Sequence, residues 1–279
     1  MIVDVHVHTP TQLETIAEAK LSPPGSRVDK QYKRNVGWAE FQEAMAPVDK
    51  LILLGIAHGS QTPNDDIARW TGMWPEKIVP FCSVDPTDPG AMEELERCVE
   101  DLGMVGIKVS PHYQNFAPMD PRACAIYARA ERLGLPIAFH QATSPRRAAP
   151  LRYAHPMALD EVATAFPELR IVVAHFGHPW QPDTIVLIRK HPHVYTDISA
   201  QFYRPWQYYH ALTLCMEYAQ LGKVFFGTDY PVTTPQETLD TLRAVNEMVE
   251  GTRFPRIPEE EIEAIIHRDA LGLLGLGTE

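Results

Sequence analysis

The chain has 279 residues and a net charge of −11, and 45% of its residues are hydrophobic. That content can build a sizeable core and excludes a disordered protein, while the acidic balance disfavours nucleic acids and membrane surfaces as partners. Four scattered cysteines without a CxxC pair exclude a disulfide framework, and no apolar run reaches the roughly 20 residues that span a bilayer, so we expect a cytoplasmic protein.

Eight short apolar runs recur along the chain, most of them rich in Val and Ile. They lack the long alternation of a half-exposed sheet, which indicates strands buried on both faces. The runs are residues 2–8, 51–57, 78–84, 105–110, 137–140, 171–175, 194–198 and 224–227.

Segments with helical patterning follow most of these runs. The clearest begins with Asp120 as N-cap and Pro121 in the first turn, and it stops at Gly134. The others are residues 89–103, 157–166, 182–190, 205–222, 234–251 and 258–275.

Eight strands alternating with helices predict a single (β/α)8 TIM barrel over residues 1–279. A doubly wound open sheet is the rival fold, but the chain carries neither the GxGxxG nor the GxxxxGK[ST] motif of its usual nucleotide sites. Residues 9–36 make a long loop after strand one, on the face where barrels build their active sites.

Ionisable side chains stand at the ends of five strands, where apolar or turn residues would be expected. Strand one ends in His6-Val7-His8, and because side chains alternate along a strand, both imidazoles face the same side. The other strand ends carry Lys108, His140, His175 and Asp229. The carboxyl ends of barrel strands converge, so we expect these side chains to form one site.

The order of the motifs VDVHVH, GIKVSPH, IAFHQ, VVAHFGHPW and FGTDYP resembles the amidohydrolase superfamily, in particular the branch that includes aminocarboxymuconate-semialdehyde decarboxylase and related hydrolases. The resemblance covers nearly the whole chain. It implies a TIM barrel that holds one divalent metal ion, zinc before manganese, with His6, His8, His140 and Asp229 as ligands. It also implies that the strand-six histidine, His175, acts in catalysis, or binds a second metal as in binuclear members.

These residue types suit metal-assisted chemistry. Three neutral imidazoles and one carboxylate leave a divalent ion with residual positive charge and an open position, where water is activated near neutral pH. Asp229 can then accept a proton, and His175 can polarise a carbonyl or donate to a leaving group.

Lys108 has three possible roles. Gly106 and Lys108 share the strand face opposite Val105, Ile107 and Val109, so the lysine points into the barrel if the apolar face meets the helices. In binuclear amidohydrolases a carboxylated lysine at this place bridges two metals, which would raise the metal count to two. The alternatives are a free ammonium that pairs with a substrate carboxylate and a lysine that extends to water.

Basic residues gather in two loops of this acidic chain, residues 20–36 and 141–156. The second loop holds Arg146, Arg147 and Arg152 and no acid. This pattern predicts a small substrate that carries a carboxylate, with a solvated basic loop as the alternative. The candidate substrate contacts are Lys108, Arg146, Arg147 and His178.

Three functions fit these residues. The first is a metal-dependent hydrolase of an amide, lactone or related bond, with His175, Asp229 and Lys108 as catalytic groups. The second is a non-oxidative decarboxylase (a lyase) of an aromatic or unsaturated acid, and the third is a barrel that binds metal or ligand without catalysis. A homodimer is expected by analogy with the family. For His112 we expect a surface or capping role, with a place in the pocket lining as the alternative.

Overall fold

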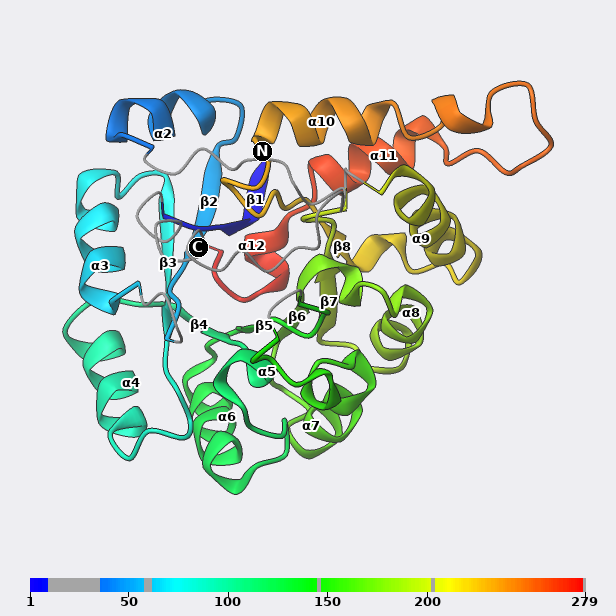
Figure 1. Cartoon of the computed structure of the whole chain (residues 1–279). Helices are drawn as coiled ribbons and strands as arrows, with labels where there is room; N and C mark the ends of the chain where they lie inside the picture. The colour runs from blue at the N-terminus through cyan, green and yellow to red at the C-terminus, as the bar shows by residue number, and fades with distance from the viewer. Residues whose placement is uncertain (10–35, 58–61, 145–146, 202–203, 278–279) are drawn as a thin grey trace.

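The computed structural model describes residues 1–9, 36–57, 62–144, 147–201 and 204–277. Eight parallel strands follow one another around the sheet in chain order, as the TIM-barrel prediction requires (Figure 1). They are β1 (Val3–Val7), β2 (Lys50–Leu54), β3 (Ile78–Ser83), β4 (Gly106–Val109), β5 (Ile137–Phe139), β6 (Ile171–Val173), β7 (Val194–Asp197) and β8 (Val224–Phe225). All eight predicted strands are therefore confirmed.

The chain after β8 closes the barrel against β1. The backbone N–H of Val5 donates to the carbonyl of Phe226 at 3.1 Å, and the N–H of Asp229 donates to the carbonyl of His6 at 2.8 Å. A parallel bridge between Val7 and Tyr230 continues this pairing. The closure brings the first and the last motif of the sequence side by side.

Helices surround the strands in the described residues. They are α2 (Trp38–Ala44), α3 (Asn64–Met73), α4 (Ala91–Glu100), α5 (Pro111–Gln114), α6 (Pro121–Leu133), α7 (Leu159–Ala165), α8 (Gln181–Lys190), α9 (Pro205–Glu217), α10 (Pro235–Arg243), α11 (Glu259–Ile266) and α12 (Ala270–Leu273). Helix α6 begins and ends as predicted, because Asp120 accepts from the N–H of Arg122 and Gly134 adopts a left-handed φ of 69°.

The last two predicted helices are each shorter than the sequence pattern indicates. Helix α10 ends at Arg243, since the side-chain amide of Asn246 forms two hydrogen bonds with the backbone of Ile257, at 2.8 and 2.9 Å, and holds the chain in another direction. The segment 258–275 divides into α11 and α12, because Asp269 accepts from the N–H of Gly272 and starts a new helix.

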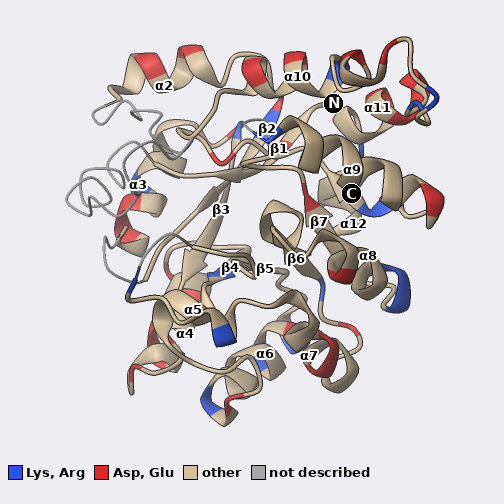
Figure 2. Ribbon diagram, turned by 45° about the vertical axis from the view of Figure 1, so that its right-hand side comes forward, with Lys and Arg blue, Asp and Glu red and all other residues tan. Residues whose placement is uncertain are grey.

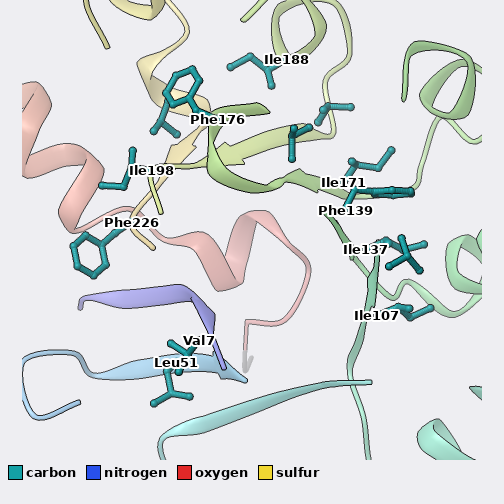
Figure 3. Packing of buried hydrophobic residues seen from close by; sticks show 14 of the residues in the cluster. Val7, Leu51, Ile107, Ile137, Phe139, Ile171, Phe176, Ile188, Ile198 and Phe226 are labelled. Atoms are coloured by element: carbon teal, nitrogen blue, oxygen red, sulfur yellow. The ribbon is translucent and has the colours of Figure 1, made fainter. Parts of the chain in front are cut away.

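Two apolar layers stabilise the barrel. The outer layer lies between strands and helices and includes Ile107, Ile137 and Ile171 from consecutive strands and Ile188 from α8 (Figure 3). The inner apolar cluster fills the barrel where the strands begin and is covered by α12. Its buried members are Val3, Val5, Ile52, Leu54, Phe81, Ala138, Val172, Tyr195, Phe225, Ala270, Leu271 and Leu274.

Charged residues are found mainly on the outer helices and loops (Figure 2). Among the described residues, none of the helices is both long and apolar enough to cross a membrane. Few of the described charged residues lie inside the barrel, and those that do gather where the strands end.

Candidate active site and metal centre

A bulge in β1 turns the first histidine inward. Asp4 pairs with Leu51 of β2 and Val7 pairs with Leu53, so β1 contains one residue more than β2 over this stretch. Val5 can then belong to the inner apolar cluster while the next residue, His6, also faces the barrel interior.

Buried Asp4 holds the bulge in place. Its carboxylate accepts hydrogen bonds from the N–H of His6 (3.1 Å), the N–H of Thr228 (3.0 Å) and the hydroxyl of Thr228 (2.6 Å). Burial raises the pKa of Asp4 to about 7, although these hydrogen bonds act in the opposite direction. The residue links β1 to the chain after β8 and so fixes His6 relative to Asp229.

Asp229 lies between the two histidines of strand one. Its Oδ1 atom is 3.6 Å from Nε2 of His6 and 3.3 Å from Nε2 of His8. Burial alone would raise the pKa of Asp229, but the neighbouring imidazoles, His175 foremost, hold it at about 2. Asp229 is therefore an ionised carboxylate at neutral pH.

His175 sits in a turn with an unusual backbone. His175 and Phe176 have φ values of 56° and 53°, in the left-handed region that costs a non-glycine residue about 1–3 kcal/mol. The N–H of His175 donates to Oδ1 of Asp197 at 3.0 Å, which helps to hold this conformation. The His175 ring stacks on that of His6, with 4.6 Å between centroids, and burial lowers its pKa.

Lys108 lies inside the barrel and does not extend to water. Its side chain is 1% exposed, and its Nζ atom is 3.4 Å from Nε2 of His6. Burial lowers the pKa of Lys108 to about 8, while the carboxylates of Asp197 and Asp229 oppose this shift. The ammonium thus retains its proton at neutral pH, next to the imidazole of the first strand.

Two further histidines extend the cluster. The ring of His140 is 4.7 Å from that of His175, and burial keeps its pKa well below the ordinary value. The ring of His112 is 5.0 Å from that of His140. The expected surface or capping role of His112 is wrong, because α5 folds this residue under the strand ends, where it is fully buried and neither ring nitrogen has a hydrogen-bond partner among the described residues.

The structure brings most of the predicted site together. The residues that meet at the strand ends are His6, His8, Lys108, His140, His175 and Asp229. His178 is buried nearby, and its carbonyl accepts a hydrogen bond from the backbone N–H of Thr143 at 2.7 Å. Arg147 is exposed, whereas Arg146 and residues 20–35 lie outside the described residues.

The donor set fits a divalent metal ion. One ligand atom from each of His6, His175 and Asp229 lies within 4.8 Å of the other two, and His8 contacts the same carboxylate. Imidazole nitrogen and carboxylate oxygen are the donors that zinc and related transition metals take in proteins. This group contains His175 in addition to two of the four predicted ligands, while His140 stands beside it through its ring contact with His175.

Sequence reasoning missed three residues that organise the site. Besides Asp4, they are Asp197 and Ser199 at the end of β7, both buried and both bonded to the predicted histidines. A carboxylate inside an otherwise buried strand was the available signal, since such a group needs partners. The histidine partners of Asp197 and Ser199 are about 20 to 190 residues away along the chain, so no local pattern names them.

The family model described as Amidohydrolase matches residues 3–276, and the chain therefore belongs to the amidohydrolase family. One relative is the 2-keto-4-carboxy-3-hexenedioate hydratase of Sphingobium sp. (strain NBRC 103272 / SYK-6), 28% identical over 42% of this chain and 40% of the relative. Another is the gamma-resorcylate decarboxylase of Rhodococcus jostii (strain RHA1), 30% identical over 41% of this chain and 44% of the relative. The matched segments thus span less than half of either relative.

Solved structures share the fold over nearly the whole chain. A dihydroxybenzoic acid decarboxylase from Polaromonas sp. JS666, solved with bound manganese and an inhibitor, has a TM-score of 0.70 at 18% identity and covers 100% of this chain and 98% of its own. A probable 2-pyrone-4,6-dicarboxylic acid hydrolase from Acinetobacter baumannii has a TM-score of 0.68 at 17% identity, over 98% and 99% of the two chains. At such identities the likeness concerns the fold.

Proposed function

We propose that this protein is a metal-dependent hydrolase that acts on an amide, lactone or related bond of a small substrate bearing a carboxylate. The observation that carries the proposal is the ionised Asp229 set among imidazoles at the strand ends, within reach of a metal position. Hydrolysis needs a group that takes a proton from water, and these side chains are proton acceptors at neutral pH.

The metal would be held by His6, His8, His140 and Asp229, with His175 beside them. When bound, a divalent ion supplies a Lewis acid that activates water and polarises a carbonyl. We favour one zinc ion. Manganese is the alternative, because N and O donors suit both metals. A second ion would require carboxylation of Lys108.

The chain's own residues then divide the work. Asp229 is ionised, since its pKa is about 2, and it accepts the proton that water loses as it adds to the substrate. Lys108 keeps its ammonium inside the barrel and attracts the carboxylate of the substrate. Lys108 is almost completely buried, so water screens its attraction for a carboxylate only weakly.

The names of the relatives support a carboxylate as the recognition group. The hydratase, the decarboxylases and the probable hydrolase are all named after carboxylic acids. Arg146, Arg147 and His178 are the further candidates for holding such a group. We also propose that the protein is a homodimer, as the family resemblance implies, and that it is cytoplasmic, as the scattered cysteines indicate.

A decarboxylase is the second candidate, and the 30% identity to gamma-resorcylate decarboxylase favours it. Loss of carbon dioxide requires delivery of a proton to the carbon that bore the carboxylate. Lys108, a buried group of the site, carries a spare proton at neutral pH, since its pKa is about 8. The same residues would then act in the reverse sense, as donor instead of acceptor.

The two reactions separate in a direct assay. The purified protein, loaded with zinc or manganese, is incubated with a panel of carboxylated lactones and amides and with a panel of aromatic acids, in water enriched in ¹⁸O. The hydrolase reading predicts ¹⁸O in the acid product and no gas, and Asp229→Asn should abolish it while exposed Asp88→Asn does not. Carbon dioxide release without hydrolysis would overturn the hydrolase in favour of the decarboxylase. A protein that binds metal but converts no compound of either panel would overturn both.

A further inference from the structure

Two buried histidines of the site use the same ring nitrogen to reach the end of β7. Nδ1 of His6 is 3.0 Å from Oδ2 of Asp197, and Nδ1 of His175 is 2.7 Å from the hydroxyl oxygen of Ser199. Asp197 and Ser199 are almost completely buried, so these contacts are shielded from water. Each imidazole therefore has one nitrogen committed to the protein and one left for the site.

The hydrogen positions on these nitrogens follow from counting donors and acceptors. Three hydrogen-bond donors stabilise the ionised form of the Asp197 carboxylate: its Oδ1 accepts from the backbone N–H groups of His175 and Ser199, at 3.0 Å each, and from the hydroxyl of Ser199. An ionised carboxylate can only accept, so Nδ1 of His6 must carry the hydrogen that joins it to Asp197.

Ser199 likewise requires a hydrogen on Nδ1 of His175. Its hydroxyl donates to Oδ1 of Asp197, which also accepts from the backbone N–H of Ser199 at 3.0 Å. A hydroxyl has a single hydrogen, so the oxygen of Ser199 can only accept from Nδ1 of His175. Both histidines thus carry hydrogen on Nδ1, so in the neutral ring Nε2 is bare.

The bare nitrogens are those that face the proposed metal position. Nε2 of His6 lies 3.6 Å from Oδ1 of Asp229 and 3.4 Å from Nζ of Lys108. Since Nδ1 of His175 is taken by Ser199, its Nε2 is the atom left to join His6 and Asp229 in their group of ligand atoms.

His178, three residues further on, is fixed the other way round. The carbonyl of His175 can only accept, and it takes a hydrogen from Nε2 of Gln201 at 2.9 Å. The amide oxygen of Gln201 then faces Nε2 of Gln181, at 3.5 Å, and the same Gln181 nitrogen donates to Nδ1 of His178 at 3.1 Å. A ring nitrogen that accepts a hydrogen bond bears no hydrogen, so His178 is a neutral ring with its hydrogen on Nε2.

We propose that Asp197 and Ser199 are positioning residues that lock His6 and His175 as Nδ1–H tautomers and so aim two unprotonated Nε2 atoms at the metal position, while Gln181 locks His178 as the opposite tautomer, a hydrogen-bond donor. His175 is thereby a proton acceptor or metal ligand before it can act as a donor. The arrangement belongs to the folded chain and holds for either reaction considered above.

Nitrogen-15 NMR of the histidine rings tests this in the full-length chain. We expect Nδ1–H signals for His6 and His175 and an Nε2–H signal for His178, assigned from the spectra of single His→Gln variants. Spectra are recorded both on metal-free and on zinc-loaded protein, since zinc on Nε2 would by itself favour the Nδ1–H form. An Nε2–H signal for His175 or His6 in the metal-free protein overturns the proposal.

Variants separate a tautomer lock from a general structural role. Ser199→Ala should move His175 towards the Nε2–H form, and Asp197→Asn should weaken zinc binding about 10–100-fold through His6. Thr196→Val is the matched control, since its hydroxyl is also buried on β7 but donates to the carbonyl of Val173. If Thr196→Val shifts the tautomers or zinc affinity as strongly, Asp197 and Ser199 are merely structural. Should Ser199→Ala not fold, the wild-type spectrum still decides.

Discussion

The barrel interior is apolar where the strands begin and ionisable where they end, although the same strands build both parts. β7 gives Tyr195 to the inner apolar cluster and Asp197 to the site, and the β5 run gives Ala138 to the cluster and His140 to the site. At the apolar end, packing alone satisfies each side chain. At the ionisable end each group needs a partner of suitable charge, because burial penalises an unpaired charge heavily.

The comparison shows how stability and chemistry are divided along each strand. The inner apolar cluster and the outer layer remove hydrocarbon from water and stabilise the fold. The ionisable end contributes positioned lone pairs and charges, held by Asp4, Asp197 and Ser199. Substitutions at the ionisable end should therefore lower activity, and substitutions at the apolar end should lower stability.

The largest expected effect is on activity at the ionisable end. Asp229→Asn keeps the shape of the side chain but removes the charge that accepts a proton and attracts a metal, so we expect kcat to fall about 10²–10⁴-fold. Melting temperature without added metal should change little. Unchanged kcat together with unchanged metal content would remove Asp229 from the site.

The next effect is on stability at the apolar end. Leu274 is fully buried against the barrel, so Leu274→Ala should lower the free energy of unfolding by about 2–5 kcal/mol, measured by urea denaturation. The neighbouring Leu273 is 38% exposed, and Leu273→Ala should cost less than about 0.5 kcal/mol. The activity per folded molecule should survive both changes. Equal losses from the two variants would show that α12 does not close the barrel.

A smaller effect concerns the response to acid. Burial lowers the pKa of His112 to about 4, below the unfolded value of 6.5, so the unfolded chain binds a proton first and stability falls as the pH drops from about 6.5 towards 4. At pH 5 this amounts to about 2 kcal/mol for one histidine.

His112→Leu should remove that share of the acid sensitivity, measured by urea denaturation of metal-free protein at pH 7 and pH 5. Exposed His267→Gln is the control and should leave the difference between the two pH values as in the wild type. An unaltered difference in His112→Leu would mean that His112 is solvated in solution.

The sequence alone was sufficient to predict the eight strands and the barrel that they form. Strands buried on both faces need continuous apolar runs, so runs such as 137–140 and 171–175 stand out in any reading. The polar residues that end them were visible for the same reason, since His140 and His175 interrupt an apolar pattern. Parallel strands then place these ends on one face of the barrel.

The partners of these residues were not visible. His6 meets Asp197 across 191 positions of sequence, and Asp4 meets Thr228 across 224, contacts that exist because the barrel closes. The bulge in β1 was likewise hidden, because strict alternation would have placed Val5 and His6 on opposite faces. His112 was misread because Gln114 binds the carbonyl of Val84 and turns α5 inward.

We propose above all that the ionisable end of the barrel holds a divalent metal ion. The most direct test is elemental analysis of the protein purified without added metal, beside Asp229→Asn prepared in parallel. We expect about one equivalent of zinc or manganese per chain in the wild type and its loss in the variant. A wild-type protein that retains no metal, and takes up none from a zinc titration, would contradict it.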